Sequence, residues 1–136
     1  DMVNISNHDY LTGLKNRRYY IERLKILDNI KEYPFGIVNL DLNGLKIIND
    51  VYGHSVGDEA LMKTAEVLTE TCDKSNIISR VSGDEFTVIL PKSGEKETKK
   101  LKNDLLKAFE TIKIMNLDLS VLKGTKDISK GELVSL

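Results

Sequence analysis

Three carboxylates stand next to short apolar runs, where they could hold a cation. Asp41 lies near the end of the apolar run 35–42, while Asp84 and Glu85 lie in a polar turn between the runs 77–81 and 86–90. If the two later runs form a hairpin beside the first, these carboxylates converge, and they repel one another unless a cation sits between them. Mg²⁺ prefers such oxygen ligands together with substrate phosphates. Alternatively, Asp41 and Asp84 are only polar residues that end strands, and the pattern leaves both interpretations open.

The segment after Asp41 has residue types that suit a phosphate. Gly44 would let backbone N–H groups approach an anion closely, and Lys46 could add a positive charge. The P-loop sequence GxxxxGK[ST] does not occur, so this pattern does not support a P-loop nucleotide site.

Two further polar residues suit a nucleobase. The Asn49 amide can both donate and accept, and Asp58 could accept from the N1–H and 2-amino groups of guanine, a donor pair that adenine lacks. Asp58 also stands three residues after Ser55, which resembles a capping box at the start of a helix, and the two roles can coexist. By itself, His54 is more often a loop or packing histidine than a catalytic one.

The overall composition is that of one soluble globular domain. The chain has 136 residues, 40% hydrophobic and 30% charged, with a net charge of −1, so bulk nucleic-acid binding is not expected. No apolar run approaches the roughly 18 residues that span a bilayer, and there is no signal-peptide pattern, so we expect a cytoplasmic domain without direct membrane contact. The single Cys72 is expected to be a core thiol.

Apolar periodicity indicates alternating helices and strands that must position these residues. Asn16 can cap the first helix, whose inward face would carry Tyr20, Leu24, Leu27 and Ile30. We predict, in chain order, a helix over 17–33, a strand over 35–42, a glycine-containing segment 44–53, a helix over 56–72, the hairpin, a helix over 95–114 and a strand over 117–122. The tail 124–136 is ambiguous, and its last part, "ISKGELVSL" (128–136), could begin a helix. This order favours an α+β sandwich with helices on a mixed sheet.

Four ordered segments resemble the GGDEF domain of bacterial diguanylate cyclases. They are "DYLTGLKNRR" (9–18), "DLNGLKIINDVYGHSVGDEAL" (41–61), "RVSGDEF" (80–86) and "LSV" (119–121). The resemblance implies a palm-like (ferredoxin-like), mostly antiparallel sheet flanked by helices and related to nucleotidyl cyclases. It also implies condensation of two GTP to cyclic di-GMP, with release of pyrophosphate, by an antiparallel homodimer under the control of an upstream sensor or receiver domain.

The resemblance further implies a role for individual residues. The metal, Mg²⁺ or Mn²⁺, would be bound by Asp41, Asp84 and the carbonyl of Leu42, while Asp84 and Glu85 would be catalytic. Substrate binding would fall to Gly44, Leu45, Lys46, Asn49, His54, Asp58 and Gly83. Residues 1–136 would form a single, C-terminally incomplete GGDEF domain of a longer multidomain protein, since the family continues with a helix that carries basic phosphate contacts.

Several positions depart from the family pattern. Ser82 replaces the first glycine of the signature, Asn43 replaces an acid, and Leu122 stands where a glycine often follows the late strand. The inhibitory product site would fall on Asp73 and Asn76 but lacks its arginine, so product inhibition by that route is not expected. These departures leave an alternative open, a catalytically inactive domain that binds a nucleotide or a partner and regulates a neighbouring domain.

Overall fold

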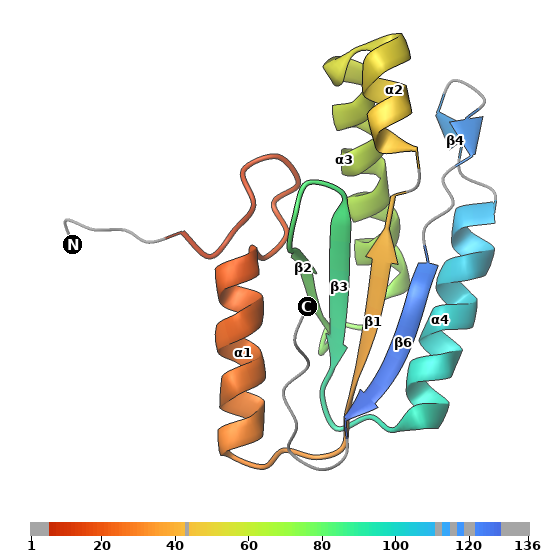
Figure 1. Cartoon of the computed structure of the whole chain (residues 1–136). Helices are drawn as coiled ribbons and strands as arrows, with labels where there is room; N and C mark the ends of the chain where they lie inside the picture. Colours follow the sequence, from red (N-terminus) through yellow and green to blue (C-terminus); the bar gives the residue numbers. More distant parts are fainter. Residues whose placement is uncertain (1–5, 43, 111–112, 115–116, 119–121, 129–136) are drawn as a thin grey trace.

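The computed structural model describes residues 6–42, 44–110, 113–114, 117–118 and 122–128. Strands β2, β3, β1 and β6 form one sheet in that spatial order, and β4 and β5 form a separate small one (Figure 1). The elements are α1 (Arg17–Asn29), β1 (Phe35–Asp41), α2 (Leu45–Tyr52), α3 (His54–Thr71), β2 (Ile77–Arg80), β3 (Glu85–Leu90), α4 (Glu95–Glu110), β4 (Lys113–Ile114), β5 (Leu117–Asp118) and β6 (Leu122–Ile128).

The sheet topology is that of a split β-α-β unit. The helices after β1 carry the chain to β2 at the edge of the sheet, and β3 then returns between β2 and β1. All three pairings of the four-stranded sheet are antiparallel. This is the ferredoxin-like arrangement, so the α+β class and the palm-like topology are confirmed. The expectation of a mixed sheet is wrong, because β3 separates β1 from β2, the one strand that would run parallel to it.

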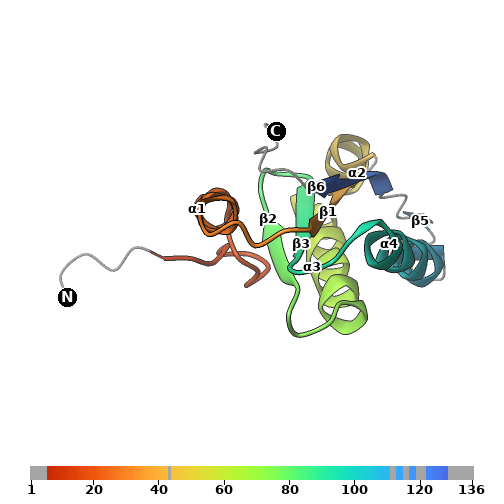
Figure 2. The same cartoon turned by 90° about the horizontal axis from the view of Figure 1, so that it is seen from below.

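Helices cover both faces of the sheet, α1 on one side and α3 with α4 on the other (Figure 2). Alternate residues of each strand point to opposite faces. On the α1 face, Phe35, Ile37 and Ile89 pack with Tyr20, Leu24 and Leu27. On the opposite face the larger core comprises Val38, Leu40, Leu42, Ala60, Leu61, Val67, Leu68, Phe86, Val88, Leu90, Leu101, Leu105 and Phe109.

The first helix begins as predicted and ends earlier. The Asn16 side chain accepts from the backbone N–H of Tyr19 over 3.0 Å and caps α1. At the other end, Lys31 adopts a φ of 54°, and the N–H of Glu32 donates to the Leu27 carbonyl over 3.0 Å. This is a Schellman-type ending. It terminates the helix at Asn29 rather than near residue 33 and leaves Ile30 59% exposed, so Ile30 is not on the buried face.

The segment 44–53 contains a helix that the sequence pattern did not predict. α2 occupies Leu45–Tyr52, and Gly53, with a φ of 91°, separates it from α3. α3 begins at His54, and its N-cap Gly53 provides no side-chain hydrogen bond. The predicted capping box from Ser55 to Asp58 is therefore wrong, because Ser55 already lies inside the helix.

The C-terminal elements also differ from the prediction. α4 ends at Glu110 rather than near residue 114, and 113–114 belong to β4. The predicted strand 117–122 is divided between β5 and the first residue of β6, and 119–121 lie outside the described residues. Residues 124–128 belong to β6. The possible helix over 128–136 lies outside the described residues except for Ile128, the last residue of β6. Among the helices described, none has the length and apolar character needed to span a membrane.

Candidate functional site

Asp41 and Asp84 meet at one end of the sheet. Asp41 is the last residue of β1, opposite Glu85, the first residue of β3. Just beyond this pair, the backbone N–H of Leu42 donates to the Asp84 carbonyl over 2.9 Å, which holds the two segments side by side. The predicted pairing of the hairpin beside the first strand is thus confirmed, and it brings the three acidic residues to the same place.

The carboxylates that meet here carry like charges, which repel one another. Burial raises the pKa of the Asp84 carboxyl, and so do the negative charge of Asp41, a hydrogen bond between these two side chains and the charge of Glu85. Two carboxyl groups can share a hydrogen bond only if one of them carries a proton. The pair therefore carries a free-energy cost when both groups ionise, which a proton or a cation would remove.

The donor set of this pair suits a hard divalent cation. Mg²⁺ usually takes one or two protein carboxylates and completes its shell with water and substrate phosphates. Asp41 and Asp84 supply such a pair of oxygen ligands. Within the described residues, no cluster of three or more acidic, histidine or cysteine side chains could hold a metal ion. The residues present therefore fit a cation whose remaining ligands come from elsewhere, such as a bound phosphate.

The hairpin tip is a tight four-residue turn. Ser82 and Glu85 exchange two backbone hydrogen bonds of 3.4 Å, and the Ser82 hydroxyl donates to Glu85 Oε1 over 2.9 Å. Gly83 lies in this turn, but its φ is not in the positive region, and a Cβ there would meet no atom within 4 Å. The turn itself therefore does not require glycine, and the space beside Gly83 is open.

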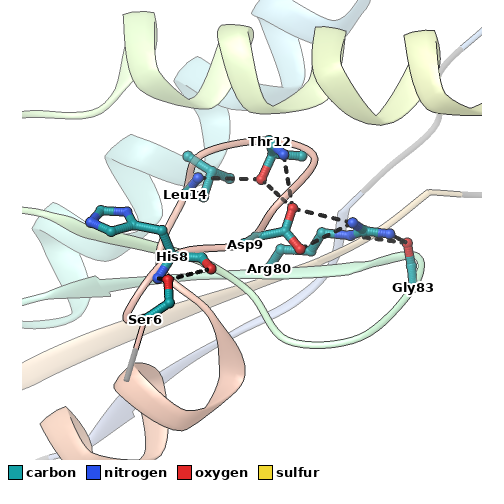
Figure 3. Close-up of polar contacts among 7 residues, drawn as sticks. All are labelled: Ser6, His8, Asp9, Thr12, Leu14, Arg80 and Gly83. Carbon is teal, nitrogen blue, oxygen red and sulfur yellow. Dashed lines mark hydrogen bonds and ion pairs between the residues drawn. The ribbon is translucent and has the colours of Figure 1, made fainter. Parts of the chain in front are cut away.

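An arginine ties the tip to the N-terminal loop (Figure 3). Arg80 Nη1 lies 3.1 Å from Asp9 Oδ1, and Arg80 Nη2 donates to the Gly83 carbonyl over 2.9 Å. Burial raises the pKa of Asp9, but hydrogen bonds from Thr12 and Arg80, with the charge of Arg80, lower it overall. A pocket of about 270 Å³ opens beside this network, lined by Asp9, Tyr10, Arg80, Val81, Ser82 and Gly83.

The start of α2 presents backbone groups near the acidic pair. Gly44 caps the helix in the left-handed conformation (φ 77°), and no side chain caps this end with a hydrogen bond. Helix N-termini of this kind attract anions through their N–H groups. Leu45 is partly buried and Lys46 is exposed, whereas Leu42 is only 2% exposed. Asn43 lies outside the described residues.

The residues predicted to contact the nucleobase lie on either side of the junction between α2 and α3. Asn49 is partly buried, and its side chain lies directly over Gly57 in α3, next in sequence to Asp58. Asp58 and His54 are both exposed in the first turns of α3. The structure thus brings Asn49 close to the residue that precedes Asp58 and leaves the Asp58 carboxylate accessible.

Sequence reasoning missed three features that shape this site. The Asp9–Arg80 ion pair joins residues 71 positions apart, so only the tertiary fold reveals it. The spacing of Asp9 and Thr12 is a local turn signal, and the Thr12 N–H and hydroxyl both donate to Asp9 Oδ2 over 2.8 Å. Gly57, an isolated glycine inside a helical pattern, is the third, and such a glycine often has a packing reason.

Comparison with known proteins gives a consistent assignment. The family described as diguanylate cyclase, GGDEF domain, matches residues 6–131. An uncharacterized protein of Sinorhizobium fredii, y4lL, is 35% identical over 135 residues, which cover 95% of this chain and 16% of that protein. The diguanylate cyclase DgcM of Escherichia coli is 35% identical over 95 residues, covering 68% of this chain and 23% of DgcM.

A solved structure is also similar. In the crystal structure of the diguanylate cyclase SiaD of Pseudomonas aeruginosa with its activator SiaC, the matched chain gives a TM-score of 0.82 at 27% identity, covering 94% of this chain and 52% of that one. This chain therefore spans less than a quarter of the two curated relatives and about half of the SiaD chain. The match over residues 6–131 and the shared fold show that the chain belongs to the GGDEF domain family.

Proposed function

We propose that this domain is a diguanylate cyclase, which condenses two GTP molecules to cyclic di-GMP and releases two pyrophosphates. The observation that carries the proposal is the meeting of Asp41 and Asp84 where β1 ends and β3 begins. Their negative charges repel each other there. Such a pair has a clear use in phosphoryl transfer, which is catalysed mainly by positioning and by neutralising charge. Membership of the family and the similarity to DgcM support the same reaction.

Asp41, Asp84 and the carbonyl of Leu42 would hold Mg²⁺ or Mn²⁺. The bound cation would supply charge neutralisation at the phosphates and activation of the attacking oxygen. Asp84 would lie near the 3′-hydroxyl and accept its proton. Glu85 would orient the reacting groups from the start of β3.

The remaining site residues would bind GTP. The N–H groups of Gly44 and Leu45, at the uncapped start of α2, would contact phosphates together with the exposed Lys46. Asn49 and Asp58 would read the guanine edge, and His54, the first residue of α3, would line the substrate site. The open space beside Gly83 would leave room for the nucleotide.

Each protomer would hold one GTP, so turnover would require an antiparallel homodimer in which two sites face each other. We also propose that the domain works in the cytoplasm of a bacterium within a longer multidomain protein and that an upstream sensor or receiver domain controls it. Its relatives support this arrangement, because the chain spans only 16% of y4lL and 23% of DgcM.

One observation favours a second candidate, an inactive domain that binds a nucleotide or a partner and regulates its neighbour. The Ser82 hydroxyl donates to Glu85 Oε1 over 2.9 Å, and this contact can restrain a carboxylate that the reaction would use. The cyclase remains our proposal, because the Asp41–Asp84 pair and the start of α2 are both in place.

The two candidates are separated by incubating the purified protein with GTP and Mg²⁺ and identifying the nucleotides by mass spectrometry. The cyclase predicts cyclic di-GMP and pyrophosphate, both lost in Asp84→Ala, with the circular dichroism spectrum of the variant unchanged. GTP binding without product would favour the regulatory domain. A protein that does not bind GTP would refute both nucleotide-based roles.

A further inference from the structure

A side chain at position 57 would displace the side chain of Asn49. A Cβ on Gly57 would lie 1.7 Å from Asn49 Oδ1 and 2.9 Å from Asn49 Cγ, with Leu45 Cδ1 next at 3.4 Å. Real Cβ atoms essentially never lie within 3.0 Å of such an atom, so the Asn49 side chain would have to move. Glycine is also disfavoured inside a helix relative to alanine. Gly57 therefore has a specific reason to lie in α3, namely to receive the Asn49 carboxamide.

The backbone of Asn49 is fixed by the same stretch of chain. The N–H of Gly53 donates to the Asn49 carbonyl over 2.9 Å, and the N–H of Gly57 donates to the Gly53 carbonyl over 3.3 Å. Gly53 has a φ of 91°, a conformation that favours glycine. Asn49, Gly53 and Gly57 are thus spaced by four residues. Gly53 holds the main chain of Asn49 by a hydrogen bond, and Gly57 leaves the space that the Asn49 side chain occupies.

We propose that Gly57 is a positioning residue for base recognition, because it seats the Asn49 carboxamide beside Asp58. This inference rests on the proposed function, in which Asn49 and Asp58 read guanine. A methyl group at position 57 displaces the Asn49 carboxamide, which then no longer makes its hydrogen bond to the base. Phosphate binding, which depends on the other end of α2, is retained.

The contact itself is tested without any nucleotide by a double-variant cycle. Gly57→Ala should lower the urea concentration at the midpoint of unfolding of the otherwise unchanged protein, because the new methyl group clashes with the Asn49 side chain. In an Asn49→Ala background the same substitution should raise the midpoint, because the space is then free and alanine favours the helix. Equal changes in the two backgrounds would show that Gly57 does not seat Asn49.

The functional part is tested with α,β-methylene analogues of GTP and ATP, measured by isothermal titration calorimetry on the intact protein with Mg²⁺. The unchanged protein should prefer the guanine analogue. Gly57→Ala should reduce that preference about tenfold, the factor that one hydrogen bond to the base provides. Gly57→Ala should have no further effect on the preference once Asn49 is alanine.

A matched control is Gly36→Ala in β1, where a Cβ would lie 1.9 Å from Thr98 Oγ1. That variant should lose stability and keep its guanine preference. An unchanged preference in Gly57→Ala would overturn the positioning role. If the unchanged protein shows no guanine preference, the proposed base site is refuted, and the urea cycle still decides whether Gly57 seats Asn49.

Discussion

Replacing Asp84 by asparagine removes one of two carboxylates that repel each other and nearly keeps the shape of the side chain. Because burial and the charge of Asp41 raise the pKa of Asp84, the folded chain holds this proton more tightly than the unfolded chain does. The stabilising effect of the proton is fully present below the unfolded pKa of about 3.9 and is lost as the pH rises through the folded pKa. Asp84→Asn should therefore stabilise the metal-free protein at neutral pH while it abolishes the proposed activity.

The size of this effect follows from Coulomb's law and the exposure of the pair. Two unit charges about 4 Å apart repel by about 1 kcal/mol in bulk water and by about 4 kcal/mol at an effective dielectric constant of about 20. Asp41 and Asp84 are both only partly buried, so solvent screens them and the lower value applies. We expect Asp84→Asn to gain about 1 kcal/mol of unfolding free energy at pH 7, which corresponds to about 4 °C in Tm.

The assay is urea unfolding of both proteins between pH 4 and pH 8 with EDTA present. The gain in Asp84→Asn should grow with pH and approach zero at the acid end. Asp73→Asn is a control of opposite sign, because hydrogen bonds from the Ser75 side chain and backbone lower the pKa of Asp73. That variant should lose stability at neutral pH. An Asp84→Asn protein that is less stable than the wild type at pH 7, or a difference independent of pH, would show that the two carboxylates do not repel each other in the folded chain.

Three further predictions concern the tip and the core. Arg80→Ala should cost about 2 kcal/mol in urea unfolding, because it leaves a largely buried Asp9 carboxylate without the arginine, and it should cost clearly less in an Asp9→Ala background; an equal loss in both backgrounds would contradict the ion pair. Ser82→Gly should raise cyclic di-GMP formation several-fold by freeing Glu85, and an unchanged rate would show that the hydroxyl does not restrain it. Cys72, whose pKa burial raises to about 12, should react with Ellman's reagent at pH 8 at least about tenfold more slowly when folded than in urea, and equal rates would argue against its burial.

The core faces of the longer helices were predictable because their apolar residues repeat at the helical period. Leu61, Ala65 and Leu68, spaced by four and then three residues, are all buried in α3. The end of α1 was not predictable in the same way, because Lys31, a residue without any turn preference, adopts a positive φ there. Neither Lys31 nor its two neighbours in sequence is a glycine or a proline, so no residue type marks this position.

The short helix α2 shows where periodicity fails. Its eight residues bury one large apolar side chain, Ile48, while Ile47 is 67% and Val51 is 65% exposed. Without a continuous buried stripe, the glycines at both ends suggested only an irregular segment. The helix is recognised only once it packs on α3, which is also why the contact between Asn49 and Gly57 was not foreseen.

The acidic pair was predictable, and the network that supports it was not. Placing a hairpin beside the strand 35–42 was sufficient to bring Asp41 near Asp84, because antiparallel pairing aligns the strand ends. The link from Arg80 to Asp9 depends instead on how the N-terminal loop packs against β2. Lys15 forms a bridge to Ser79 at that place, a contact without any local sequence signal.

The proposed cyclase reaction depends on whether Asp41 and Asp84 together hold a divalent cation. The direct measurement is a Mn²⁺ titration of the protein, followed by electron paramagnetic resonance, with the α,β-methylene GTP analogue bound. We predict saturable Mn²⁺ binding that is lost in Asp41→Asn and in Asp84→Asn and retained in the distant Asp73→Asn. Mn²⁺ binding of equal affinity in all four proteins would contradict the assignment of this pair as the metal site.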